Sequence, residues 1–243
     1  MKGRQQRVRL SAAVAGLQPT WSSEEVERAI RAGEIEVESR VVLNPATLVM
    51  AGAPVRHRPP VELAGRRKLG WAIDTFGVDA SGRTVVDVGA STGGFTQAWL
   101  VAGAARVYAV DAGHGQLRGS LRQDPRVVNR ERTNVADLSP AVIPEPIDAV
   151  SVDVSYLSLS AAVAQLTSVE LVAGALLLGL VKPMFELRLA TIPSDPSVLH
   201  RARDVAIAGV TAAGWHVGGC EECPVRGRRG AVEYFVFATL RAH

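Results

Sequence analysis

Short apolar runs alternate with longer amphipathic stretches from about residue 62 to the end of the chain. The runs predict strands, and stretches with apolar residues three and four positions apart predict helices. The predicted strands are 84–88, 106–110, 126–130, 147–152, 175–181, 216–222 and 232–240, and the predicted helices lie near 67–77, 94–102, 160–170 and 197–213. Because alternating strands and helices form a parallel sheet covered on both faces, we predict a doubly wound α/β fold.

The first 60 residues have a different pattern. An apolar helical stripe follows Ser22 and Ser23, either of which suits a helix N-cap; the stripe consists of Val26, Ala29 and Ile30. Residues 34–38 then alternate charged and apolar side chains, as in a half-exposed strand, and a second strand or turn follows near 41–43. The proline-rich stretch Pro54–Pro60 is typical of a linker. We therefore predict two domains, 1–60 and 61–243.

Composition narrows the class of protein. A chain of 243 residues, 47% of them hydrophobic, suffices for one α/β core with a small appendage. The longest apolar run, Leu171–Val181, is too short to cross a bilayer, so we expect no membrane partner. The basic N-terminus lacks the apolar segment of a signal peptide, which favours the cytoplasm. The Cys220-x-x-Cys223 pair stands alone, so we expect no metal site.

A glycine-rich turn after the strand 84–88 is the strongest chemical signal. The next predicted strand ends in Asp111, about 20 residues later, where an acid reaches a ribose hydroxyl. The turn is not G-x-G-x-x-G and carries no lysine for phosphate, which favours a nucleoside without a pyrophosphate, with S-adenosylmethionine (SAM) as the candidate cofactor. The expected contacts are Gly89, Ser91, Thr92, Gly93, Gly94, Phe95 and Asp111.

Motifs spread over residues 63–240 resemble those of the hemolysin-A-like (TlyA) branch of the FtsJ-type methyltransferases. Residues 89–96, Gly-Ala-Ser-Thr-Gly-Gly-Phe-Thr, are similar to motif I of that family. The other matching segments, in family order, are 115–117, 121–127, 131–134, 153–159, 180–183 with 185–186, and 232–234. The resemblance implies a Rossmann-like class I SAM-binding fold in residues 61–243 and an S4-like α+β domain in residues 1–60.

The resemblance also implies an rRNA ribose 2'-O-methyltransferase with a Lys-Asp-Lys-Glu tetrad. Carried over motif by motif, the tetrad is Lys68, Asp153, Lys182 and Glu233. A ribose hydroxyl is a poor nucleophile at neutral pH, and a lysine held among carboxylates can stabilise the developing alkoxide. A modest net charge of +3 permits nucleic-acid binding without requiring it.

Three departures from the family pattern argue against RNA as the substrate. Residues 22–40 hold six glutamates against three arginines, and an acidic face repels phosphate. The segment 63–69 keeps Lys68 but lacks the family's serine, first arginine and histidine. Met184 replaces a glutamine, and the apolar segment 187–193 replaces a glycine- and lysine-rich loop. The segment 187–193 therefore predicts either a lid that packs down over a small substrate or a segment whose Leu187, Leu189 and Ile192 belong to the core.

These departures favour SAM itself as the substrate. The resemblance extends to azetidine-2-carboxylate synthases, which cyclise SAM and release methylthioadenosine. In that interpretation Tyr156 and Phe185, with Phe95 and Trp21, hold the sulfonium by cation–π contacts, and Asn134, Ser155 and Asp153 hold the amino-acid end. The alternative is rRNA ribose 2'-O-methylation, for which the basic run 226–229 would contact phosphate. The sequence gives no oligomeric state.

Overall fold

The computed structural model describes residues 6–58 and 63–241. The chain divides into two compact units, residues 1–62 and 63–243. The elements of the first unit are β1 (Arg7–Arg9), α1 (Leu10–Leu17), α2 (Ser23–Arg31), β2 (Ile35–Val37), β3 (Arg40–Val41), β4 (Leu48–Met50) and β5 (Val55–His57). The S4-like assignment and the domain boundary at residue 60 stay predictions.

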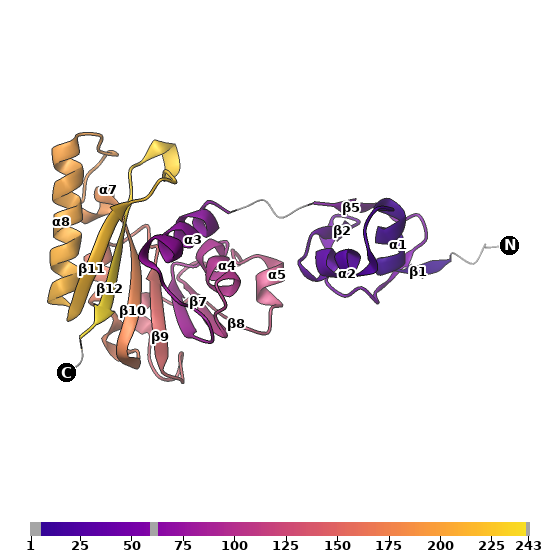
Figure 1. Cartoon of the computed structure of the whole chain (residues 1–243), viewed down its shortest axis with the longest axis horizontal. Helices are drawn as coiled ribbons and strands as arrows, with labels where there is room; N and C mark the ends of the chain where they lie inside the picture. The colour runs from indigo at the N-terminus through magenta and orange to yellow at the C-terminus, as the bar shows by residue number, and fades with distance from the viewer. Residues whose placement is uncertain (1–5, 59–62, 242–243) are drawn as a thin grey trace. The chain divides into compact units, whose positions relative to one another are not determined.

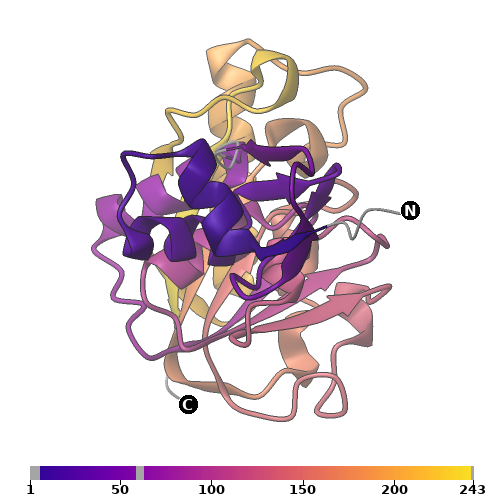
Figure 2. The ribbon, with the colours of Figure 1, turned by 90° about the vertical axis from the view of Figure 1, so that its right-hand side faces the viewer.

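The first unit packs its two helices on one side and its short strands on the other (Figure 2). Strands β3, β2 and β5 form one small antiparallel sheet, and β1 pairs with β4. Its core contains Leu10 and Val14 of α1, Ile30 of α2 and Ile35 of β2, all fully buried. Ser22 is the N-cap of α2 and forms a capping box with Glu25.

The predicted linker 54–60 is wrong in its first half. Residues Val55–His57 form β5, which pairs antiparallel with β2, while residues 59 and 60 lie outside the described part of the chain. The prolines at 54, 59 and 60 flank this strand rather than interrupt it, so they are compatible with an edge strand. Helix α1 and strands β1 and β4 carry no signal that the sequence analysis detected.

The second unit contains the remaining elements (Figure 1). In chain order they are α3 (Ala64–Phe76), β6 (Thr84–Val88), α4 (Gly94–Val101), β7 (Arg106–Asp111), α5 (Gly119–Arg122), β8 (Val127–Glu131), η1 (Val135–Asp137), β9 (Ile147–Val152), α6 (Leu159–Val163), η2 (Leu166–Ser168), β10 (Leu171–Val181), α7 (Pro183–Glu186), α8 (Pro196–Ala212), β11 (Trp215–Glu222), η3 (Arg228–Gly230) and β12 (Tyr234–Leu240).

A seven-stranded sheet with the order β11-β12-β10-β9-β6-β7-β8 runs through this unit. Strands β10, β9, β6, β7 and β8 are parallel, as predicted, but β12 runs antiparallel to both of its neighbours. Residues 223–233 connect β11 to β12 as a loop, so β12 returns in the opposite direction and lies between β11 and β10. The order along the chain reverses between β6 and β9, so a ligand crevice is expected at their carboxyl ends.

Helices cover both faces of the sheet and create two hydrophobic cores. Helices α3 and α4 pack on one face around the buried Trp99, and α6 and α8 pack on the other face around Trp215 (Figure 1). The α/β Rossmann-like prediction is confirmed. The predicted helix 160–170 is divided into α6 and η2, and the short helices α5 and α7 were not predicted.

Within residues 6–58 and 63–241, no helix combines the length and the apolar character needed to cross a membrane. Cys220 lies on β11 and Cys223 just beyond its end, and both are free thiols. The described residues also hold no group of three or more His, Cys, Asp or Glu side chains placed to bind a metal ion.

Candidate active site

A cavity of about 260 Å³ lies at the carboxyl ends of β6, β7 and β9, where the strand order reverses. Gly89 follows β6 with a φ of +88°, and a Cβ at this position would lie 2.3 Å from the backbone oxygen of Asp153. Only glycine therefore allows the ends of β6 and β9 to approach this closely. The cavity is lined by Val88, Gly89, Ser91, Val110, Asp111, Ala112, Gly113, Gln116, Thr133, Val135, Asp153, Val154, Ser155 and Tyr156.

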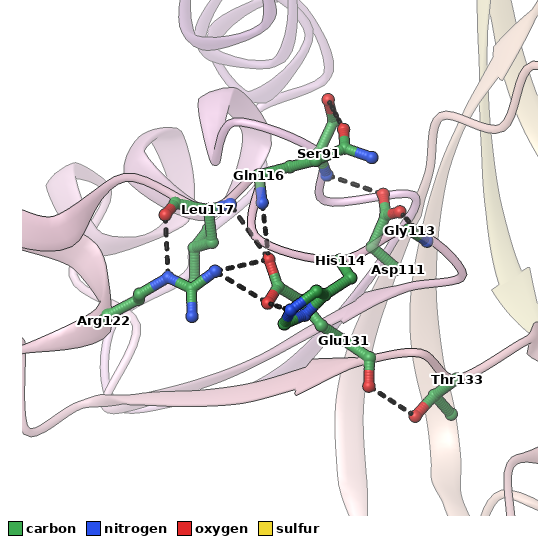
Figure 3. A network of polar contacts seen from close by, with 9 residues as sticks. All are labelled: Ser91, Asp111, Gly113, His114, Gln116, Leu117, Arg122, Glu131 and Thr133. Atoms are coloured by element: carbon green, nitrogen blue, oxygen red, sulfur yellow. Dashed lines mark hydrogen bonds and ion pairs between the residues drawn. The ribbon is translucent and has the colours of Figure 1, made fainter.

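Asp111, at the end of β7, joins the two loops that border this cavity (Figure 3). Its Oδ2 accepts a hydrogen bond from the backbone N–H of Ser91 at 2.8 Å, and its Oδ1 accepts one from the N–H of Gly113 at 2.6 Å. The hydroxyl of Ser91 donates to Gln116 Oε1 at 3.0 Å. Because each carboxylate oxygen has a further lone pair, Asp111 keeps acceptor capacity toward the cavity.

Glu131, at the end of β8, holds the loop after β7 in place (Figure 3). Its Oε1 accepts from the backbone N–H groups of Gln116 at 2.8 Å and Leu117 at 3.1 Å, and Arg122 Nη2 lies 2.7 Å from both carboxylate oxygens. Desolvation raises the pKa of Glu131, but the backbone donors of this loop and Arg122 outweigh it and lower the pKa to about 2. Glu131 is therefore ionised, and its contacts with Gln116, Leu117 and Arg122 hold a loop that lines the cavity. We call this set of contacts the clasp.

Six of the residues predicted to bind SAM line this cavity: Gly89, Ser91, Asp111, Asp153, Ser155 and Tyr156. Gly93 and Gly94 do not, and their physical role differs from the predicted one. A Cβ at Gly93 would meet Leu121 Cδ1 at 2.1 Å, and a Cβ at Gly94 would meet the backbone of Gly65 at 2.8 Å. These two glycines allow close packing of helices, and their predicted contact with SAM stays a prediction.

Three other residues predicted to contact SAM interact with neighbouring residues of the protein. Phe95 is only 3% exposed and stacks on Phe235 with the ring centroids 5.8 Å apart, so it belongs to the core. Asn134 forms the N-cap of η1 in a capping box with Asp137. The carbonyl of Thr92 accepts a hydrogen bond from the N–H of Arg118, which ties the glycine turn to the start of α5. None of the three lines the SAM-side cavity described above.

A second cavity, of about 550 Å³, lies beside the first and shares Ser155 with it. Lys182, at the end of β10, points its Nζ to within 2.5 Å of Asp153 Oδ1 and donates a hydrogen bond to Ser155 Oγ at 2.8 Å. The Asp153–Lys182 ion pair therefore stands at the boundary, since Asp153 lines the first cavity and Lys182 the second. The second cavity also has an apolar wall that includes Pro183, Phe185, Ile192 and Val232.

A second lysine–carboxylate pair is buried beneath this boundary. Lys68 of α3 places its Nζ 2.5 Å from Glu233 Oε2, and both side chains are more than nine-tenths buried. Tyr234 pairs with Val181 in the sheet register, so Glu233 and Lys182 are neighbours at the ends of β12 and β10. The structure thus brings all four tetrad residues together as two ion pairs.

Three aromatic residues predicted to hold the sulfonium lie in different places. Tyr156 lines the first cavity with its side chain, is 53% exposed, and has a pKa raised chiefly by desolvation. Phe185 lines the second cavity instead of the SAM-side one. Trp21 packs edge-on against His57 inside the first unit.

The segment 187–193 is not a packed lid, because Thr191 is exposed and Ile192 is 37% exposed at the cavity wall.

Several lining residues were missed by the sequence analysis: Ala112, Gly113, Gln116, Thr133 and Val135. They follow β7 and β8 directly, so the rule that ligands bind beyond the carboxyl ends of parallel strands could have found them. Arg228 and Arg229 belong to the basic run that the rRNA interpretation assigned to phosphate contacts, and both line the second cavity.

The residues present fit SAM. Asp153 Oδ1 is buried and accepts no hydrogen bond of good geometry from the described residues, although Lys182 Nζ lies close to it. Asp153 nevertheless places a carboxylate in the wall of the cavity, which suits a ligand with cationic groups, and Asp111 offers acceptors for ribose hydroxyls.

Comparison with known proteins agrees with this chemistry. Residues 65–240 match the model of the FtsJ-like methyltransferase family. The 16S/23S rRNA (cytidine-2'-O)-methyltransferase TlyA of Mycobacterium tuberculosis is 36% identical over 241 residues, which cover 95% of this chain and 89% of that protein. A solved protein of Streptococcus thermophilus, described as a "putative hemolysin", matches with a TM-score of 0.70 and 28% identity over 98% of this chain and 90% of that chain.

The chain belongs to the FtsJ-like methyltransferase family and is a SAM-dependent methyltransferase. Within that family it is a member of the TlyA/hemolysin A branch. The fold alone is shared more widely: a structure from Listeria monocytogenes, described as a "putative S-adenosylmethionine dependent methyltransferase", matches with a TM-score of 0.54 at 17% identity, over 74% of this chain and 99% of that chain.

The prediction that the chain cyclises SAM is wrong. A relative 36% identical over nearly the whole chain is named for methyl transfer to rRNA ribose, which agrees with the alternative interpretation. A small, closed substrate site was inferred from the segment 187–193, and that segment is open in the structure.

The acidic face of residues 22–40 was also misread, because β5 was taken for a linker. His57 of β5 lies 3.1 Å from Glu34, Arg58 lies 3.1 Å from Glu36, and Arg31 pairs with Glu27 at 3.1 Å. Glu25 is occupied in the capping box of α2. Most of these glutamates therefore have local partners and do not form an unpaired acidic surface.

Proposed function

We propose that this methyltransferase transfers the methyl group of SAM to a ribose 2'-hydroxyl of ribosomal RNA. The observation that carries the proposal is the Asp153–Lys182 pair between two cavities. The cavity on the Asp153 side has the lining expected for SAM, and the larger cavity on the Lys182 side has room for a nucleotide. The name of the M. tuberculosis relative supports a ribose of rRNA as the acceptor.

SAM, when bound, supplies an electrophilic methyl group, and the protein must make a ribose hydroxyl nucleophilic. As the 2'-oxygen bonds to the methyl carbon, the S–CH3 bond breaks, S-adenosylhomocysteine leaves and the hydroxyl proton passes to solvent. The Lys182 ammonium, fixed by Asp153 and Ser155, can stabilise the negative charge that develops on the 2'-oxygen. A fixed cation in a partly buried site acts without the reorganisation that water would need, so the geometry of this pair determines the rate.

The Lys68–Glu233 pair has a supporting role in this proposal. It is buried, so both charges are desolvated and each depends on the other. Glu233 directly precedes β12, and Lys68 lies on α3, so the pair fixes the position of α3 against the end of β12. Loss of one partner would leave an unpaired buried charge next to Lys182.

The test is an assay of methyl transfer to ribosomal subunits and to purified 16S and 23S rRNA. Radiolabelled SAM reports transfer, and mass spectrometry of nucleosides shows whether the methyl group is on the ribose. We expect 2'-O-methylated nucleosides with S-adenosylhomocysteine as the second product. Lys182→Ala should lower the rate by about 10²–10³-fold, the usual contribution of one group that stabilises a developing oxyanion.

Arg201→Ala is the matched control, because Arg201 is an exposed basic residue on α8. Methylation of a base, or no RNA methylation by a protein that binds SAM, would refute the proposal. An rRNA substrate also implies a cytoplasmic location, which stays part of this proposal.

A further inference from the structure

The loop between β11 and β12 carries three arginines in four residues, and their surroundings differ. Arg226 Nη1 pairs with Glu222 Oε1 at 2.8 Å, so its charge is matched locally. Arg228 and Arg229 are exposed, and in the described part of the chain neither has an ion-pair or hydrogen-bond partner for its guanidinium. Both line the second cavity, together with Lys182 and Glu233.

The loop has a defined backbone. Gly227 N–H donates to the Ala231 carbonyl at 2.8 Å, and Gly230 N–H donates to the Gly227 carbonyl at 3.2 Å. Arg229 has a φ of +56°, which costs a non-glycine residue free energy and often marks a functional position. The turn is therefore held in a shape that places two adjacent arginines at the cavity.

The loop is also coupled to the tetrad. A Cβ at Gly227 would lie 2.2 Å from Glu233 Oε1, so the loop backbone packs directly on the carboxylate that pairs with Lys68. The loop backbone that carries the two unpaired arginines thus has a fixed position relative to the site where the 2'-hydroxyl would react.

We propose that Arg228 and Arg229 bind RNA phosphates next to the acceptor ribose. The inference rests on the proposed function and names the part of the substrate that this edge of the site recognises. In a polynucleotide a phosphate lies beside every 2'-hydroxyl, so a ribose placed at Lys182 brings its phosphates to the nearby cavity wall. Guanidinium groups are suited to this contact because they bind phosphate oxygens through two hydrogen bonds.

The charge pattern selects phosphate over an uncharged acceptor. An acceptor without charge would leave both exposed arginines with water alone, whereas a phosphate offers them a charged hydrogen-bond acceptor. Arg226, which is already paired with Glu222, would contribute little to this recognition. The three arginines therefore provide an internal control for charge on the same loop.

The test compares Arg228→Gln and Arg229→Gln, singly and together, with Arg226→Gln. Binding of an rRNA fragment is measured by fluorescence anisotropy over a range of salt concentrations. We expect the double variant to bind RNA about tenfold more weakly, and its salt slope to be smaller by about 0.7 per lost contact to single-stranded RNA. Arg226→Gln should match the wild type in both quantities. Binding of SAM, measured by calorimetry, should not change in any of the four variants.

The outcomes separate this proposal from the proposed function. An unchanged salt slope in the double variant, or an equal loss in Arg226→Gln, overturns the phosphate contact while rRNA methylation by the wild type stands. A wild type that binds RNA through these arginines but methylates no ribose refutes the function and keeps the contact. Because both side chains are exposed, the variants should melt like the wild type, and Arg228→Lys should restore part of the RNA affinity.

Discussion

The two cavities at the catalytic edge differ in how firmly the chain fixes their walls. On the SAM side, Asp111 and Glu131 bind backbone N–H groups of the loops that form the wall. On the acceptor side, the segment 187–193 is largely exposed, and Arg228 and Arg229 have no ion-pair partner among the described residues. The loops of the SAM-side cavity are thus held by hydrogen bonds within the protein. The acceptor-side cavity presents two arginines without an ion-pair partner among the described residues.

The difference fits the two ligands that the proposal assigns. SAM is the same molecule in every turnover, and a preorganised site avoids the entropy cost of ordering loops on binding. A large polyanion can order an open loop through its own contacts, and unpaired arginines steer it electrostatically. The asymmetry therefore predicts that substitutions on the SAM side affect folding and SAM binding, and that those on the acceptor side affect RNA binding.

The largest effect is expected from a glycine on the SAM side. Gly89→Ala combines a φ of +88° with a Cβ only 2.3 Å from the Asp153 backbone oxygen. Strain should cost about 1–3 kcal/mol, and overpacking about 1–3 kcal/mol more. We expect a strongly lowered melting temperature and no SAM binding.

The matched variant on the acceptor side is Gly230→Ala. Gly230 has a φ of +80°, but a Cβ there would meet nothing within 4 Å. It should cost about 1–2 kcal/mol, the strain of the left-handed region alone, with SAM binding retained. Equal melting temperatures for the two variants would mean that the SAM side is not the more tightly packed of the two regions.

A smaller effect is expected from a buried acid beneath the SAM side. Asp87 of β6 is fully buried, and it accepts hydrogen bonds from Thr96 Oγ1 at 2.7 Å and Ser151 Oγ at 2.9 Å. Desolvation outweighs these donors and raises the pKa of Asp87 to about 7. Because the folded pKa lies above the unfolded one, the stability of the wild type falls as pH rises from about 4 to about 7.

Asp87→Asn should remove this pH dependence while it keeps the size of the side chain. The variant should gain stability relative to the wild type between about pH 4 and about pH 7, because only the wild type must ionise a buried carboxyl there, and it should keep a constant difference at higher pH. Urea denaturation at several pH values measures the free energy of unfolding of both proteins. A difference between the two proteins that does not vary over this range would show that Asp87 is already ionised in the fold at about pH 4.

The sequence predicted the parts of this molecule that local patterns encode. Apolar runs located the strands of the main sheet, and the motifs placed Lys68, Asp153, Lys182 and Glu233 at one site. It missed β5, because prolines flank a strand of only three residues. It missed the packing of Phe95 and Gly93 within the protein, because a glycine or an aromatic residue in a motif does not reveal whether its neighbour is a ligand or another helix.

The wrong prediction of a small substrate arose for a similar reason, because local patterns do not show which distant residues are in contact. Counting charges along residues 22–40 ignored His57 and Arg58, which are distant in sequence and lie 3.1 Å from Glu34 and Glu36. Apolar composition likewise predicted a closed lid for residues 187–193, but three-dimensional packing determines whether such a segment is covered. Long-range contacts, which no local pattern contains, decided both points.

The smallest effect tests the clasp itself. Glu131→Gln removes the charge that binds Arg122 and the N–H groups of Gln116 and Leu117, but it keeps the side-chain size. Hydrogen bonds to charged groups contribute about 1.5–3 kcal/mol each, and part of that loss should appear as disorder of the loop. We expect the Kd for SAM to rise about tenfold, which corresponds to about 1.4 kcal/mol.

Glu222→Gln is the counterpart on the acceptor side, because it releases Arg226 in the same way as Glu131→Gln releases Arg122. It should leave the Kd for SAM unchanged, since Glu222 is exposed and lines neither cavity. The pKa of Glu131 is lowered to about 2, so the clasp is complete above about pH 4.5 and weakens only as pH falls toward 2. The SAM affinity of the wild type should therefore show no contribution from Glu131 titration between about pH 4 and about pH 5, and calorimetry over that range would reveal one if Glu131 kept the ordinary pKa of a glutamate.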